Sequence, residues 1–431
     1  MSLYGRNKRI NLSPLFKKSG SVFILRITGM VLTYVGILFI TNVYGAEVYG
    51  RFSLVQTLLQ LIILLFSMGL GTAIIKLTSD QNFFSGTRPI NTYLKNAIGL
   101  ILISSMVCSA LLVVLKSVLA VKIFNDPGLI PYLKYLSYFV FFGIYHAFIM
   151  GFIQAKGKFV KFGLNMYVTP YLLFLGALIA GTFFKHSEEL IIFFFILSFT
   201  VVSLFMTTEI PWRSLNVRKK IPLKNLLDLS IPMMFSAAFI FIANWTDVFM
   251  LGAMVNKTDL GVYNAAYKLA IIAVVVINAV NTVLGPKISQ LYGQNNIDQI
   301  KVEVKQATKL ITYLTIPIVL VLILYRKPLL GFFGPEFIAA ESALVIISMG
   351  LLFNALSGSV GQVLNMTNHQ KALRNITIIG ASSNVLLNYV LIKKMGIEGA
   401  AIASLITNVL INIICLIYIK IKFNFFAFFN P

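Results

Sequence analysis

The sequence has few of the residues that carry most catalytic and metal-binding chemistry. Its 431 residues include two cysteines, three histidines and 14 acidic residues. Cys108 and Cys415 lie in apolar stretches without metal-type spacing, so we expect free thiols. His146, His186 and His369 are scattered and form no ligand pair. Carboxylate pairs, nucleophile motifs and phosphate-binding loops are missing too, so we expect neither an enzyme nor a bound cofactor or metal.

Charged residues are also scarce. Only 12% of the chain is charged and 58% is hydrophobic, with a mean hydropathy of +0.87. This composition excludes a secreted disulfide scaffold, a disordered chain and an ordinary cytosolic enzyme. A net charge of +22 would suggest nucleic-acid binding in a soluble protein. In a chain this apolar, the basic residues instead indicate orientation in a membrane, and no nucleic-acid partner is expected.

The apolar residues gather in segments long enough to cross a bilayer. A helix needs roughly 20 apolar residues to span the hydrocarbon core, and helices satisfy every backbone group there. We therefore predict an all-α, polytopic membrane protein with about twelve transmembrane helices. They cover residues 20–43, 52–76, 93–117, 132–155, 161–184, 189–210, 229–253, 262–284, 307–326, 337–360, 373–393 and 397–419.

The distribution of Lys and Arg predicts the orientation of these helices. With a cytoplasmic N-terminus, the cytoplasmic segments carry about twice as many basic residues as the external ones. The clearest clusters are Lys156–Lys161 and Arg213–Lys220. We predict a cytoplasmic basic tail (1–19), a six-helix lobe (20–210), a cytoplasmic linker (211–228) and a second six-helix lobe (229–431). Both termini are then cytoplasmic, and the first span is retained rather than cleaved.

The two halves of the chain resemble each other at an offset of about 211 residues. Glu47–Phe52 lies over Thr258–Tyr263, and Lys76 lies over Lys287. Six spans per half means that both halves enter the membrane from the same side. Such a parallel repeat is typical of secondary transporters, whose sites lie between the repeats.

Several motifs resemble the Wzx-type polysaccharide flippases of the multidrug/oligosaccharidyl-lipid/polysaccharide (MOP) exporter superfamily. Tyr44–Ser53 is similar to the family's first external loop. Thr246–Gly252 and Gly261–Leu269 are similar to its seventh and eighth spans. Further matches are Gly334–Phe337, Asn384 with Asn388, and Gly396–Ala401.

The resemblance implies transport by alternating access. The substrate would be a polyprenyl-pyrophosphate-linked oligosaccharide repeat unit, moved across the bacterial inner membrane for surface polysaccharide synthesis. Its partners would be this substrate, membrane lipids and other polysaccharide-assembly proteins, and the chain would act as a monomer. The alternatives are a MATE-like multidrug exporter and a lipid II-type flippase. A membrane-embedded polymerase or ligase is less favoured, because it would need a sizeable external catalytic loop.

Polar residues inside the spans are candidates for contact with the substrate. Arg26 lies about six residues inside the first span, and a guanidinium can hold two pyrophosphate oxygens at once. Lys268 and Asn264 share a helix face, as do Gln56 and Gln60. We predict that these five residues line the cavity. The alternatives are snorkelling of the cations to the interface and hydrogen bonding between helices.

Asp247 is a carboxylate inside the seventh span, where it requires a proton, a cation or a basic partner. Asn244 precedes it by three residues and shares its helix face. We predict a site for proton or sodium coupling, or an ion pair with a base such as Lys268. A purely structural ion pair is the alternative.

Overall fold

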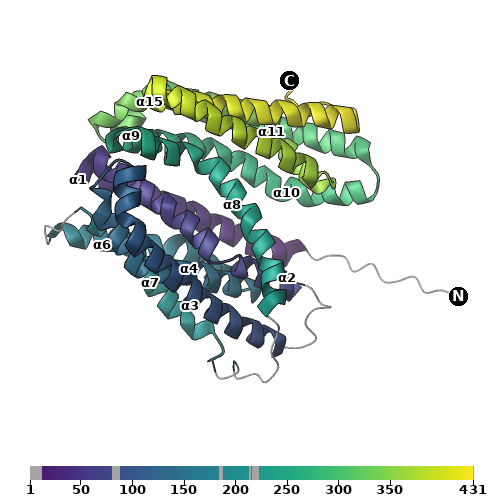
Figure 1. The fold of residues 1–431 in the computed structure, drawn as a ribbon. Coiled ribbons are helices and arrows are strands. Elements are labelled where there is room, and N and C mark those ends of the chain that lie inside the picture. Colours follow the sequence, from purple (N-terminus) through teal and green to yellow (C-terminus); the bar gives the residue numbers. More distant parts are fainter. Residues whose placement is uncertain (1–11, 80–87, 184–187, 213–214, 216–222, 431) are drawn as a thin grey trace. The chain divides into compact units, whose positions relative to one another are not determined.

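A computed structural model describes residues 12–79, 88–183, 188–212, 215 and 223–430. The described residues form helices and connecting turns, with no strand among them (Figure 1). Ten segments of this part of the chain are long and apolar enough to cross a membrane when the bent helix α8 (Leu223–Met254) counts once.

Two of these segments are double spans. Helix α1 (Leu12–Phe66) is interrupted by Gly45 with φ 83° and ψ 178°. Helix α15 (Gln370–Phe423) is interrupted by Gly396 with φ 56° and ψ −129°. Glycine adopts positive φ without a steric penalty, so each interruption turns the chain without another loop. Dividing α1 and α15 there gives twelve spans among the described residues and confirms the predicted all-α, polytopic fold.

The first compact unit comprises residues 1–39 and 55–241. Both α3 (Arg88–Ser117) and α7 (Leu190–Met206) pack on α4 (Leu129–Ala155). Helix α2 (Leu70–Ser79) lies close to α4 where Gly71 faces Gly151. A Cβ on Gly151 would lie 2.7 Å from the Gly71 backbone. The remaining elements are the π-helix Val118–Ile123, α5 (Phe159–Gly163), the π-helix Leu164–Val168, α6 (Thr169–Phe183) and the 3-10 turn Thr207–Glu209.

The second compact unit comprises residues 40–54 and 242–431. Helix α13 (Glu341–Ser357) packs between α11 (Ile297–Leu324) and α15, and α10 (Val274–Gly293) packs on α11. Figure 1 draws this group from green to yellow. The other elements are α9 (Lys257–Ala270), the turn Ile271–Ala273, α12 (Arg326–Gly331), the turn Pro335–Ala340 and α14 (Val360–Met366).

These units divide the chain differently from the predicted lobes. Residues 211–241 group by their contacts with the first unit, and residues 40–54 group with the second. The predicted boundaries at 20–210, 211–228 and 229–431 therefore stay a prediction about the protein in its membrane.

The predicted basic cluster after α4 is ion-paired in the structure. Glu209 accepts hydrogen bonds from Lys158 at 2.6 Å and from Lys161. The Lys156 ammonium donates to the Glu209 backbone carbonyl at 2.8 Å. Glu209 therefore binds three of the predicted cytoplasmic lysines, two through its carboxylate and one through its backbone carbonyl. The other predicted cluster, Arg213–Lys220, lies almost wholly outside the described residues.

Candidate functional site

The second unit contains a buried carboxylate with a set of uncharged partners. Asp247 lies in α8 and is 6% exposed. The Tyr263 hydroxyl donates to its Oδ2 at 2.9 Å, and the Asn388 amide donates to its Oδ1 at 2.7 Å. The Ser404 hydroxyl also donates to Oδ2. Three separate helical segments thus converge on one acid side chain.

The hydrogen bonds continue beyond the carboxylate. The Asn388 amide also donates to Asn384 Oδ1 at 3.0 Å, and the Asn384 amide donates to Thr407 Oγ1 at 3.3 Å. Asn384 and Asn388 share a face because they are four residues apart on a helix. They precede the turn at Gly396, whereas Ser404 and Thr407 follow it. The turn in α15 therefore assembles the network. Hereafter the Asp247 network means Asp247, Tyr263, Asn384, Asn388, Ser404 and Thr407.

The oxygen atoms of the Asp247 network have the chemistry that a bound proton or a small hard cation requires. A buried carboxylate is costly unless it is hydrogen-bonded, and here uncharged donors supply the bonds. Asn388 Oδ1 is buried and has no hydrogen-bond partner among the described residues, so a further oxygen acceptor lies in the network. Carboxylate, amide and hydroxyl oxygens suit hard cations better than soft ones. Clusters of His, Cys, Asp and Glu that could hold a transition metal are not found in the described part of the chain.

The partners of Asp247 differ from those that the sequence suggested. Asn244 is exposed and does not belong to the network. Lys268 is half-buried with its ammonium 5.3 Å from the centre of the Trp245 ring, whereas Asp247 bonds to uncharged groups. The four-residue spacing of Asn384 and Asn388 indicated that both amides lie on one helix face, where the structure places them in the Asp247 network. Tyr263 lies in a family-like motif, but nothing in the sequence marked Tyr263 or Ser404 as a partner of Asp247, because single hydroxyls are common in membrane helices.

The other predicted cavity residues are divided between the two compact units. Asn264 is 1% exposed and donates from its amide to Ser53 Oγ at 2.9 Å, so its amide joins two segments of the second unit. Gln56 and Gln60 are half-buried in the part of α1 that belongs to the first unit. Arg26 is exposed on the same helix. A substrate role for these residues stays a prediction.

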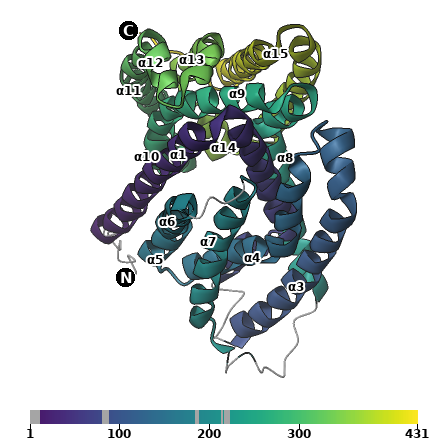
Figure 2. The same ribbon diagram turned by 90° about the vertical axis from the view of Figure 1, so that its left-hand side faces the viewer.

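The Ser53–Asn264 bond joins two positions 211 residues apart, which is the offset of the predicted repeat. Gly50 and Gly261 have the same separation and also meet. A Cβ on Gly50 would lie 1.8 Å from the Lys257 carbonyl oxygen, and one on Gly261 would lie 2.1 Å from the Ala46 carbonyl oxygen. Ala46 and Lys257 are themselves repeat-related, so the contact is reciprocal. Figure 2 shows the bend of α1 against α9. This local two-fold relation supports the repeat between these segments.

Known proteins share both the sequence pattern and the fold. Residues 39–340 match the family described as polysaccharide biosynthesis protein. The chain belongs to this family. It is 25% identical over 396 residues to a probable low-salt glycan biosynthesis flippase of Haloferax volcanii, which covers 90% of the chain and 80% of that relative. It is also 25% identical to a capsular polysaccharide biosynthesis protein of Staphylococcus aureus, over 43% of the chain and 47% of that relative.

Solved structures show the same fold. An inward-facing MATE-family multidrug resistance transporter of the MOP superfamily matches with a TM-score of 0.78 and 15% identity, over 93% of this chain and 98% of that one. The lipid II flippase MurJ in an inward closed conformation matches with a TM-score of 0.73 and 18% identity, over 94% and 87%. The family match confirms the predicted membership in a polysaccharide biosynthesis family, the solved structures confirm the fold, and the chain is a multi-pass membrane protein.

Proposed function

We propose that the protein is a flippase that moves polyprenyl-pyrophosphate-linked oligosaccharides across a bacterial plasma membrane by alternating access. The match to the polysaccharide biosynthesis family over residues 39–340 carries this proposal. The Haloferax relative, named as a glycan biosynthesis flippase, supports transport rather than enzyme chemistry. The likeness to a multidrug transporter concerns the fold alone, and no feature of the site favours that alternative.

The direction of such transport agrees with its energetics. An anionic headgroup that moves from the inner to the outer leaflet leaves a negative interior. The membrane potential favours this step by about 2.3 kcal/mol per charge for each 100 mV. We propose that a monomer performs the cycle and that ion coupling serves mainly to reset the carrier. The anionic headgroup would be held by cationic side chains, with Arg26 and Lys268 as the candidates.

The Asp247 network is our proposed coupling site. Its carboxylate is enclosed by side chains from α8, α9 and both limbs of α15, so occupancy by a proton or a sodium ion changes contacts between these segments. Keeping an ionisable group within the membrane is costly, and such groups generally mark ion pathways. A coupling role would explain why position 247 is an acid, although an uncharged residue could make similar hydrogen bonds there.

The coupling proposal predicts a loss of transport on Asp247→Asn. Flipping would be measured with the purified protein in liposomes, as the protected fraction of a lipid-linked oligosaccharide under a sodium or proton gradient. We expect gradient-dependent flipping to fall at least about tenfold, equivalent to about 1.4 kcal/mol. Asp228→Asn makes the same chemical change at an exposed position of the same helix and should transport normally.

The outcomes separate the two parts of the proposal. Flipping that responds to neither gradient nor to Asp247→Asn would refute coupling at Asp247 and leave flippase activity standing. Failure of the wild-type protein to move any lipid-linked oligosaccharide would refute the flippase itself. Dependence on sodium at constant pH, or on pH without sodium, identifies the ion. Normal surface-glycan export by both Arg26→Ala and Asp247→Ala in cells would show that these residues are not the site.

A further inference from the structure

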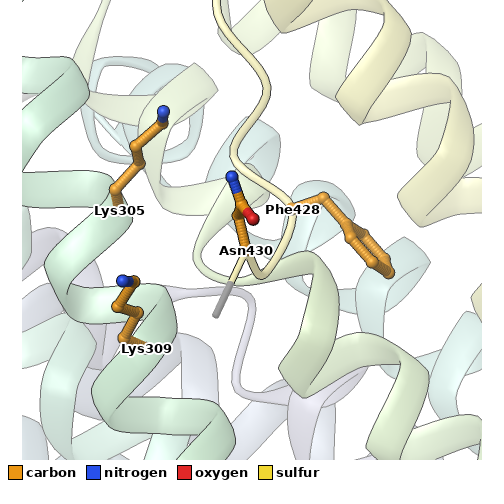
Figure 3. A pocket seen from close by; sticks show the side chains of 4 residues that line it. All are labelled: Lys305, Lys309, Phe428 and Asn430. Atoms are coloured by element: carbon orange, nitrogen blue, oxygen red, sulfur yellow. The ribbon is translucent and has the colours of Figure 1, made fainter.

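The end of the chain closes a small basic pocket on α11. The pocket has a volume of about 100 Å³ and is lined by Lys305, Lys309, Phe428 and Asn430. Figure 3 shows the two lysines rising from one helix, with the Asn430 amide across from them. All four residues belong to the second unit.

The pocket wall is a packed part of the fold. Helix α15 ends at Asn424, which takes a left-handed conformation at φ 55°. After it, Phe425 and Ala427 are 2% and 0% exposed, whereas Phe426 and Phe428 point outward at 51% and 36%. The backbone N–H of Phe429 donates to the Leu356 carbonyl at 2.8 Å. The Thr308 hydroxyl donates to the Ala427 carbonyl at 3.0 Å, which ties this segment to α11 beside the two lysines.

The two pocket lysines have no carboxylate partner among the described residues. Lys305 and Lys309 are four residues apart and share a helix face. Neither takes part in the ion pairs that the structure shows among its described residues, and the nearby Glu303 pairs with Lys287 at 2.6 Å. Two ammonium groups and an amide offer only hydrogen-bond donors apart from the amide oxygen. They therefore suit an anion with several oxygen acceptors, such as a phosphate.

The surroundings of the pocket are apolar. Tyr313 and Leu320, four and eleven residues beyond Lys309 on the same face of α11, are 57% and 50% exposed. Phe426 and Phe428 flank the same end, and the Lys420 ammonium lies 5.5 Å from the centre of the Phe426 ring. Lysines beside exposed aromatic residues at the end of a span are typical of a membrane interface. A ligand whose charged group binds the two lysines therefore has apolar protein surface beside it that can contact acyl chains.

We propose that this pocket binds the phosphate headgroup of an anionic phospholipid, whose chains lie along the exposed Tyr313 and Leu320 on the same face of α11. A free phosphate would use the lysines and the amide but not the apolar surface beside them. The lipid is thus a structural or regulatory ligand of the second unit. The proposal does not depend on the substrate that the protein transports.

The test measures lipid retention by the full-length protein. Protein purified in detergent would be incubated with phosphatidylglycerol or phosphatidylcholine, and bound lipid would be counted by native mass spectrometry. We expect phosphatidylglycerol to be retained preferentially by the wild type. Lys305→Gln with Lys309→Gln should weaken its retention by about fivefold per lysine removed. Lys305→Arg with Lys309→Arg keeps the charge and should retain the lipid.

A matched control removes the same charge elsewhere on this unit. Lys371 and Lys422 are exposed and do not line the pocket. The double variant Lys371→Gln with Lys422→Gln should bind phosphatidylglycerol as the wild type does. Equal losses in both glutamine variants, or equal retention of the two lipids by the wild type, would overturn the proposal. Displacement of the lipid by millimolar inorganic phosphate alone would also overturn it, because the site would then be an anion site without lipid specificity.

Discussion

The interiors of the two compact units differ in chemistry, although the sequence predicts that the two halves of the chain are repeats. In the first unit, aromatic rings fill the contact between α6 and α7: Phe195 lies 5.2 Å from Phe174 and 5.0 Å from Phe199 between ring centres. In the second unit, the Asp247 network fills the interior between α8, α9 and α15. One interior is packed with aromatic rings, and the other contains a hydrogen-bonded carboxylate.

The offset of 211 residues allows the two halves of the chain to be compared position by position. Subtracting 211 places Asp247 over Gly36, Asn388 over Ala177 and Ser404 over Phe193. None of these first-unit residues can ionise or donate a side-chain hydrogen bond. The matched segments thus meet at Gly50 and Gly261, whereas the side chains that bond to Asp247 have no hydrogen-bonding counterpart at the matching positions of the first unit.

We expect the largest loss of stability from a substitution in the aromatic interior of the first unit. Phe195→Ala should lower the free energy of unfolding by about 3–5 kcal/mol, because it leaves a cavity among rings that cannot collapse fully. Reversible unfolding in mixed detergent micelles would measure the change. Phe183, 81% exposed on α6, is the matched control. Phe183→Ala should change the stability by no more than about 0.5 kcal/mol. Equal effects of the two variants would mean that the rings of the first unit do not form a packed interior.

A smaller effect is expected at the reciprocal glycine contact. Gly261→Ala would place a methyl group 2.1 Å from the Ala46 carbonyl oxygen, so two backbones must separate. We expect a cost of about 1–3 kcal/mol in the same unfolding assay. At Gly176 of the first unit, a Cβ would meet no atom within 4 Å, so Gly176→Ala should be neutral or stabilise the helix by up to about 1 kcal/mol. A neutral Gly261→Ala would contradict the close contact.

The smallest effect concerns the hydrogen bond between repeat-related side chains. A double-mutant cycle of Ser53→Ala and Asn264→Ala should give a coupling free energy of about 0.6 kcal/mol, the average for polar pairs between membrane helices. Asn412 bonds to a carbonyl of its own helix at 2.8 Å. Ser53→Ala combined with Asn412→Ala should therefore be additive. Coupling in both cycles would indicate a general loosening of the second unit rather than one bond.

The sequence alone was sufficient for the fold class, the number of spans and the family. Apolar runs of span length leave a helix as the only way to satisfy the backbone in lipid, so these features follow from local composition. Asp247 stood out for the same reason, because an acid within an apolar run is costly wherever the chain places it. The repeat was visible as matched residues such as Gly50 and Gly261.

Only the tertiary structure decided which side chains meet. Asp247 binds Tyr263, Asn388 and Ser404 rather than Asn244 or Lys268, because the glycine turn in α15 brings two distant segments to α8. Asn264 met Ser53, and the basic pocket formed from α11 and the last residues of the chain. Helical periodicity fixes the face of a residue on its own helix, but the partner of that face depends on how helices cross and turn. Those choices are made by packing between segments far apart in the chain.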